Sequence, residues 1–132
     1  MKGKFMESSE HFSKAELACK CCGKADMEEN FMERLEKLRG QYGKGMILSS
    51  AYRCSRHNNE VSKTGDDGPH TTGQAIDVLI SGSNAHILLC LASKLGFTGI
   101  GVKQKGPHYQ RFLHLDDLPR DEGRPRPWIW SY

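Results

Sequence analysis

Two histidines and two aspartates have side chains that could bind a metal ion and activate water. His70 and Asp77 lie in the segment GPHTTGQAID, and His114 and Asp116 lie in the segment FLHLD. Two imidazoles and one carboxylate form the ligand set of an open catalytic zinc site, in which a fourth position is left for water. Each residue alone is more often structural, as a loop or core histidine or a hydrogen-bonded strand carboxylate. Their combination is what favours metal chemistry.

Strand patterns contain or adjoin all four residues. Residues 73–80 alternate apolar and polar side chains with period two, which predicts a strand with Asp77 at its centre. Residues 99–103 and 111–117 predict two more strands joined by a short hairpin loop, with His114 on the second. Residues 46–53 predict a further strand. We expect these strands to form one small, mostly antiparallel sheet.

Two amphipathic helices are predicted beside this sheet, over residues 25–45 and 83–97. Asp26 and Glu29 have capping-box spacing at the start of the first helix, and Gly96 is a stop signal for the second. The expected apolar stripes are Phe31, Leu35 and Leu38 in the first helix, and Ile87, Leu88, Leu91 and Leu95 in the second. Helices gathered beside an antiparallel sheet predict the α+β class.

The remaining segments are expected to be irregular or terminal. Glycines and Asn/Asp pairs between residues 54 and 72 predict a polar loop without long regular structure. The tail ends in two tryptophans and a tyrosine, so we expect it to pack back onto the domain. A chain of 132 residues fits one domain, predicted as 1–132 with a core of about 12–130.

Charge and hydropathy restrict the expected surroundings of the protein. No stretch approaches the roughly 20 apolar residues of a membrane span. The N-terminal sequence MKGKFMESSEHF lacks the apolar core of a signal peptide, which predicts cytoplasmic synthesis. The net charge of +3 is spread along the chain, and solvated charge explains Arg120, Arg124 and Arg126 better than nucleic-acid binding. We therefore expect a monomer with neither a membrane nor a nucleic acid as partner.

Five cysteines cannot all pair with one another, and three of them crowd into CKCC. An odd count without a signal peptide favours reduced thiols or a metal site over a disulfide framework. Two alternatives remain open for the N-terminal group: a second, structural zinc site or a link between two cysteines. The residues concerned are Cys19, Cys21, Cys22 and Cys54. Cys90 is predicted to be a buried helix residue.

Four motifs together resemble the zinc D-Ala-D-Ala carboxypeptidase family of peptidoglycan peptidases, whose relatives include phage endopeptidases and the hedgehog signalling domain. They are SSAYRCSRHN, GPHTTGQAID, FLHLD and RPRPW. The resemblance covers nearly the whole chain and implies the hedgehog/D,D-peptidase type of α+β fold. One departure is visible, because Gly68 stands where the family usually has serine.

The resemblance implies a catalytic Zn²⁺ held by His70, Asp77 and His114. Arg53 matches the arginine that holds the carbonyl or carboxylate of the substrate, a role that suits the fork of donors on a guanidinium. Asp116 could be the general base or could orient a ligand imidazole. Alternatively, Asp116 binds the metal and His114 is the base, and His108 is a second candidate base. His11, His57 and His86 have no predicted partner.

The implied reaction is hydrolysis of a D-Ala-D-Ala or related bond in the stem peptide of peptidoglycan, by water that zinc activates and a base deprotonates. Absence of an export signal fits a phage lysin released through a membrane lesion, or a virion component. The alternative is a cell-wall-binding or virion module that kept a zinc-stabilised fold and lost turnover. The enzyme is favoured because the expected ligands, Arg53 and Asp116 are all present together.

Overall fold

The computed structural model describes residues 4–65 and 67–132, and these form an α+β fold. Within this part of the chain are four α-helices, a five-stranded sheet and a two-stranded hairpin, which confirms the predicted class. The helices are α1 (Lys14–Leu17), α2 (Glu29–Tyr42), α3 (Ser55–Val61) and α4 (Gly82–Lys94). Two short 3₁₀ helices are η1 (Pro69–Thr72) and η2 (His108–Gln110). Residues 1–3 and 66 of the predicted domain 1–132 lie outside the described residues.

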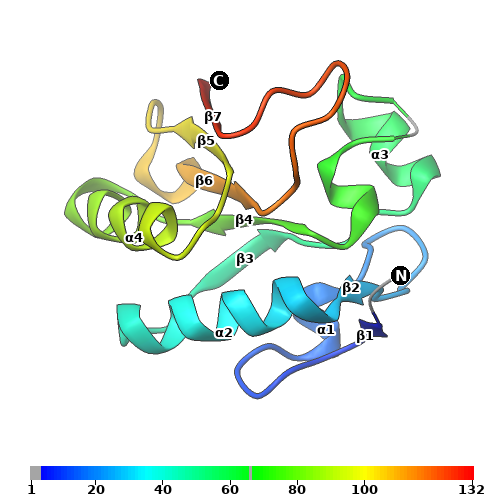
Figure 1. Ribbon diagram of the computed structural model, residues 1–132, viewed down its shortest axis with the longest axis horizontal. Helices are drawn as coiled ribbons and strands as arrows, with labels where there is room; N and C mark the ends of the chain where they lie inside the picture. Colours follow the sequence, from blue (N-terminus) through cyan, green and yellow to red (C-terminus); the bar gives the residue numbers. More distant parts are fainter. Residues whose placement is uncertain (1–3, 66) are drawn as a thin grey trace.

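The main sheet has the strand order β3-β4-β6-β5-β7 (Figure 1). Its strands are β3 (Ile47–Ser50), β4 (Ala75–Leu79), β5 (Gly99–Lys103), β6 (Phe112–Asp116) and β7 (Trp128–Ser131). All neighbours are antiparallel except β5 and β7, which are parallel. The tail therefore packs back onto the domain as predicted, and it does so as an edge strand. The small hairpin pairs β1 (Phe5–Met6) with β2 (Met27–Glu28).

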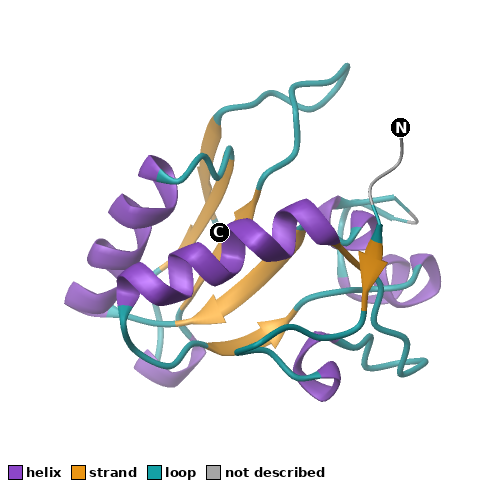
Figure 2. Cartoon of the chain, turned by 60° about the horizontal axis from the view of Figure 1, so that its bottom comes forward, coloured by secondary structure: helices purple, strands orange, loops and turns teal. Residues whose placement is uncertain are grey.

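One face of the sheet packs against α2 and α4 and forms the apolar core (Figure 2). Ile76 and Val78 of β4 point into this core, as do Leu113 and Leu115 of β6. The predicted stripe of α2, with Phe31, Leu35 and Leu38, is fully buried against them. Each such side chain contributes roughly 1.5–3 kcal/mol on leaving water. The alternation of the strands then turns the residues between them, Asp77 and His114, to the opposite face.

The predicted cap of α2 at Asp26 is wrong. Strand β2 takes up Met27 and Glu28, so the helix begins at Glu29 and Glu28 is the N-cap. The Glu28 carboxylate accepts hydrogen bonds from the backbone N–H groups of Asn30 and Phe31, at 3.0 and 2.9 Å. Extended pairing with β1 therefore displaced the helix start that the capping-box spacing favoured.

Helix α4 buries most of the predicted stripe, with one exception. Ala85, Leu88 and Ala92 are its buried residues, whereas Ile87 is 46% exposed. Cys90 is exposed as well, so its predicted burial is wrong. Leu91 and Leu95 of the predicted stripe are partly buried and pack against the core, so Ile87 is the one member that faces outward. Periodicity located the helix and three residues of its inner stripe, and it missed Ala85 and Ala92.

The region predicted as an irregular loop contains helix α3. Its N-cap is Cys54, whose sulfur accepts a hydrogen bond from the backbone N–H of His57 at 3.4 Å. The helix has a single buried residue, Asn58, whose side chain donates to Thr64 Oγ1 and to the carbonyl of Gly65. Polar contacts hold this helix, so the sequence offered no apolar period. None of the described helices is both long and apolar enough to cross a bilayer.

Candidate metal centre

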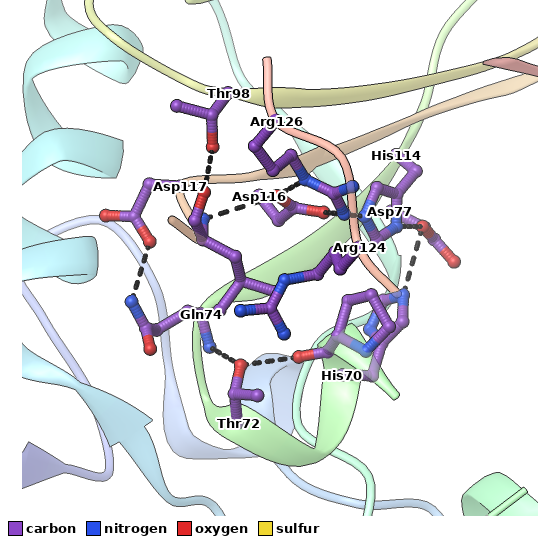
Figure 3. Close-up of polar contacts among 12 residues, drawn as sticks. His70, Thr72, Gln74, Asp77, Thr98, His114, Asp116, Asp117, Arg124 and Arg126 are labelled. Carbon is purple, nitrogen blue, oxygen red and sulfur yellow. Dashed lines mark hydrogen bonds and ion pairs between the residues drawn. The ribbon is translucent and has the colours of Figure 1, made fainter. Parts of the chain in front are cut away.

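Strand register brings Asp77 and His114 together. Asp77 of β4 pairs directly with His114 of β6, and both side chains leave the sheet on the face turned away from the apolar core. Asp77 Oδ1 lies 3.1 Å from His114 Nδ1 (Figure 3). In an antiparallel pair, opposite residues have neighbouring Cβ atoms, which is why this contact follows from the register.

His70 reaches the same point from η1. The 3₁₀ helix ends at Gly73, whose φ of +75° turns the chain into β4. A Cβ at Gly73 would also collide with the backbone carbonyl of Asp26, so this position requires glycine for two reasons. The turn sets His70 Nε2 at 3.3 Å from Asp77 Oδ1 (Figure 3). The structure thus unites the three residues predicted as ligands.

The arrangement of these three residues fits a tetrahedral metal ion. Zinc bound to nitrogen and oxygen at about 2.0–2.2 Å requires ligand atoms roughly 3.4 Å apart. The distances of 3.3 and 3.1 Å from Asp77 Oδ1 to the two ring nitrogens are close to this value. His70, Asp77 and His114 are 4%, 7% and 2% exposed. Among the described residues, this buried group could hold a metal ion.

The outer nitrogen of each imidazole has a partner that fixes its orientation. His70 Nδ1 lies 2.8 Å from the carbonyl oxygen of Ala51, to which it donates, so Nε2 keeps its lone pair for a metal. His114 Nε2 lies 2.7 Å from Asp116 Oδ2 and, donating to it, leaves the Nδ1 lone pair facing Asp77. We assign both tautomers, for the state with a metal ion bound, from these partners. Both lone pairs then converge on the region beside the Asp77 carboxylate.

The charges of Asp77 and His114 shift each other's pKa. Burial raises the pKa of Asp77, but hydrogen bonds and charge from His114 and His70 hold it well below its usual range. Burial lowers the pKa of His114, but its contacts with Asp116 and Asp77 raise it overall. Without a metal ion, a proton on the facing nitrogen of His114 therefore lets the ring donate to the ionised Asp77 carboxylate. A divalent cation would compete with protons for the same lone pairs.

Asp116 occupies the far side of His114 from Asp77. Its carboxylate is fully buried, and both oxygens accept from Arg126: Oδ1 from Nε at 3.0 Å and Oδ2 from Nη2 at 2.8 Å. The backbone N–H of Leu118 donates to Oδ1 at 3.3 Å. Burial raises the pKa of Asp116, but His114 and Arg126 lower it overall. This position matches the orienting role considered for Asp116 more closely than the role of a base.

Arg53 lies on the other side of Asp77. Its Nη2 is 3.5 Å from Asp77 Oδ2, while Nε donates to Ser50 Oγ at 3.1 Å and Nη1 donates to Asn58 Oδ1 at 3.2 Å. Its backbone N–H donates to the carbonyl of His70 at 3.1 Å. The structure therefore brings Arg53 to the predicted ligands, with its guanidinium held by three partners.

Two residues of the tail complete the surroundings of His114. Trp130 of β7 lies beside His114 with ring centroids 5.0 Å apart, and the Arg126 guanidinium lies over the Trp130 ring at 5.2 Å. Trp130 pairs with Gly101 of β5, where a Cβ would collide with the indole. Sequence reasoning placed this segment on the domain but assigned it no part in the site. The motif RPRPW was the signal that could have indicated one.

The other histidines lie elsewhere. His108, the second candidate base, is exposed in η2, and in the described part of the chain its side chain makes no hydrogen bond or ion pair with the candidate metal centre. His86 is exposed on α4. His11 does have a partner, because its Nδ1 lies 2.6 Å from Glu36 Oε1. His57 contributes its backbone N–H to the cap of α3.

The departure at Gly68 has a local explanation. A Cβ at this position would collide with the side chains of Thr64 and Asn58. Thr64 Oγ1 accepts a hydrogen bond from Asn58 Nδ2 at 2.8 Å, and Asn58 in turn accepts from Arg53. Thr64 and Asn58 thus fill the space that a serine side chain would need, and glycine is the residue that fits.

The sequence matches the protein family described as Peptidase M15 over residues 10–116. The match includes Arg53, His70, Asp77, His114 and Asp116 and stops before the tail that supplies Arg126 and Trp130. None of the curated proteins matches the chain at a significant level.

Proposed function

Because the chain belongs to the peptidase M15 family, we propose that it is a zinc-dependent peptidase that hydrolyses a D-Ala-D-Ala or related bond in the stem peptide of peptidoglycan. One observation carries the metal dependence: Asp77 Oδ1 lies 3.3 and 3.1 Å from ring nitrogens of His70 and His114. Family membership supports peptide hydrolysis. The choice of peptidoglycan rests on the resemblance of the four sequence motifs.

His70, Asp77 and His114 would hold the metal through Nε2, a carboxylate oxygen and Nδ1. Zinc bound there would supply Lewis acidity and would lower the pKa of a water toward ~7. The protein contributes a fixed, buried donor set, because the Ala51 carbonyl and the Asp116 carboxylate hold the two rings. Preorganised donors need no rearrangement during the reaction.

Arg53 is proposed to bind the carbonyl or carboxylate of the substrate. Ser50, Asn58 and Asp77 fix its guanidinium beside the ligand carboxylate. A held guanidinium has donors in a planar fork, which suits an oxygen that gains negative charge. Its place beside Asp77 would align the substrate with the metal.

We propose that Asp116 is a positioning residue rather than the general base. Both of its oxygens accept from Arg126, and one of them also faces His114 Nε2. A carboxylate held in this way stabilises the tautomer that offers Nδ1 to the metal and raises the basicity of the ring. Arg126 and Trp130 of the tail would then act on the site through Asp116 and His114.

The proposed biological setting is a phage lysin or a virion component that acts at the cell wall after cytoplasmic synthesis. We further propose that the chain works as a monomer and binds neither nucleic acid nor membrane. In support, Arg126 of the basic tail forms a buried ion pair with Asp116. Its side chain is only 6% exposed, so it offers little charge to a nucleic acid or a membrane surface. Arg124 donates to the carbonyl of Pro119.

The direct test measures metal content and bond cleavage on the same preparation. Untagged protein would be stripped with a chelator, reloaded with zinc, and incubated with purified peptidoglycan and a stem peptide ending in D-Ala-D-Ala. Mass spectrometry of the products would identify the bond. His70→Gln should lower turnover by more than the ~10- to 100-fold typical of residues that only orient a ligand. His86→Gln, an exposed histidine on α4, is the matched control.

Released D-alanine would identify a carboxypeptidase, and a cut within the stem peptide would identify an endopeptidase. If zinc binds at His70 and no bond is cleaved, the protein would be a cell-wall-binding module and not an enzyme. Equal activity of the chelated and reloaded protein would refute the metal dependence.

A further inference from the structure

A second group of metal-binding side chains lies outside the candidate metal centre. The sulfur atoms of Cys19, Cys21 and Cys54 all lie within 4.8 Å of one another. The first two belong to the loop that follows α1, and Cys54 is the N-cap of α3. The group therefore brings together two segments that are far apart in the sequence and belong to different secondary-structure elements.

The distances between these sulfurs match the edges of a tetrahedral metal site. Cys54 Sγ lies 3.6 Å from Cys19 Sγ and 3.6 Å from Cys21 Sγ. Four thiolates bound to zinc at about 2.3 Å would lie roughly 3.8 Å apart. A disulfide would join Cys54 to one partner and leave the other thiol beside it. A single metal ion bound to all of the sulfurs would account for the Cys54–Cys19 and the Cys54–Cys21 distances together.

Backbone N–H groups point at the sulfurs. The N–H of Cys54 donates to Cys19 Sγ at 3.4 Å, and the N–H of His57 donates to Cys54 Sγ at 3.4 Å. Hydrogen bonds to a sulfur favour its thiolate form, which is the form that binds metals. Cys19 is buried, so its thiolate would require a positive charge close by.

Cys22 is the candidate for a fourth ligand, beside the three sulfurs that the structure brings together. It stands three residues after Cys19, the spacing of a C-x-x-C zinc ligand pair. Gly23 follows with a φ of +74°, which turns the chain directly after the pair. Cys21 and Cys22 are exposed, so an ion can reach the group from solvent.

We propose that Cys19, Cys21, Cys22 and Cys54 form a structural zinc site that fastens the loop after α1 to the start of α3. Each thiol releases its proton to solvent when it binds, and no electron is transferred. Thiolates select soft or borderline cations, which distinguishes this site from the imidazole and carboxylate group. Because Cys54 directly follows Arg53, zinc here would also hold the backbone that carries the Arg53 guanidinium. This site does not depend on the proposed peptidase activity.

Cobalt(II) is the probe that separates the two sites. Tetrahedral cobalt bound by thiolates gives a sulfur-to-cobalt charge-transfer absorption, which a site made of histidine and aspartate cannot give. The reduced full-length chain would be stripped of metal and titrated with cobalt chloride. The wild type should show the charge-transfer absorption, and Cys54→Ser, which keeps three of the four thiols, should weaken it and bind cobalt less tightly. Cys90→Ser is the matched control, since Cys90 is exposed on α4 and should leave the absorption intact.

Cys21→Ser provides a second variant if Cys54→Ser fails to fold, because Cys21 is exposed. It should weaken the charge-transfer absorption and release cobalt more readily to a chelator. A wild type without this absorption would overturn the proposal, as would a Cys54→Ser variant whose absorption and cobalt affinity both equal those of the wild type. A mass two hydrogens lower in the purified protein, with cysteines of this group joined and no metal bound, would establish the disulfide instead. A lack of peptidase activity would leave this result unchanged.

Discussion

The candidate metal centre and the thiol group of Cys19, Cys21, Cys22 and Cys54 differ in how the fold holds their ligands. In the first, two of the three ligands stand opposite each other on paired strands. In the second, the ligands come from a loop and a helix cap, and Cys21 and Cys22 are exposed. Strand pairing fixes a site before any metal arrives, whereas loops gain their order from the metal. We therefore expect the first metal to supply chemistry and the second to supply stability.

The largest effect should come from Asp77→Asn. The amide removes the negative charge between His70 and His114, and zinc content should fall from two ions per chain to one while activity disappears. Elemental analysis of untagged protein, together with the cobalt charge-transfer absorption, measures this. The remaining ion should be the thiolate-bound one. Asp67→Asn, an exposed aspartate nearby in sequence, is the control. An Asp77→Asn variant that keeps both ions would break the distinction between the two sites.

The next effect should come from Arg126→Gln. It leaves the buried carboxylate of Asp116 without its two guanidinium donors, which costs on the order of 3–5 kcal/mol of stability. Zinc affinity of the candidate metal centre should also fall by about 10- to 100-fold, because Arg126 would no longer hold the Asp116 carboxylate that orients the His114 ring. Denaturant unfolding and competition with a zinc indicator measure the two quantities.

Arg120→Gln, an exposed arginine of the same tail, should change neither the stability nor the zinc affinity.

Asp116→Asn tests the role of the carboxylate itself. If Asp116 were the base, this variant would keep full zinc affinity and lose turnover together with the acidic limb of its pH profile. As a positioning residue it should instead weaken zinc binding and leave that limb in place.

A smaller effect is expected for Arg53→Lys, which cannot reproduce the contacts of the guanidinium with Ser50, Asn58 and Asp77. Loss of charged hydrogen bonds worth about 1.5–3 kcal/mol should lower kcat/KM by roughly tenfold or more. Metal content should be unchanged. Steady-state kinetics on a defined stem peptide, with zinc measured on the same sample, gives both readings. Loss of metal from this variant would show that Arg53 holds the Asp77 carboxylate in place and does not only bind substrate.

The smallest effect tests a third polar group, in which Glu36 accepts hydrogen bonds from Ser9 and His11 without any expected metal. Burial raises the pKa of Glu36, but these contacts lower it overall. A lowered pKa means that this stabilisation is present above the unfolded value of about 4.5 and is lost as pH falls through the folded value. Glu36→Gln should cost roughly 1 kcal/mol at neutral pH and flatten the acid branch of the unfolding curve.

Glu33→Gln, on an exposed part of the same helix, is the control for this measurement. Added zinc should not change the result. If zinc stabilised the wild type and not Glu36→Gln, this third group would also have to be counted as a metal site.

Several features of the site were predictable because they are local. The period-two pattern of residues 73–80 set Asp77 opposite to Ile76 and Val78, and the same alternation placed His114 and Asp116 on one face of β6. Backbone geometry enforces this alternation within any strand. The helix stripe of α2 was predictable for the same reason. Where a period was absent, as in α3, the pattern gave no helix, and in α4 it missed Ala85 and Ala92 and included the exposed Ile87.

The sequence by itself determined which residue types were available for metal chemistry and which strands would carry them. Only the tertiary structure decided that Arg126 reaches Asp116, that Trp130 lies on His114, and that Cys54 meets Cys19. These contacts join residues whose proximity depends on how β7 and α3 dock. Docking is set by shape and by the sum of many weak contacts, and no repeating pattern along the chain records that sum.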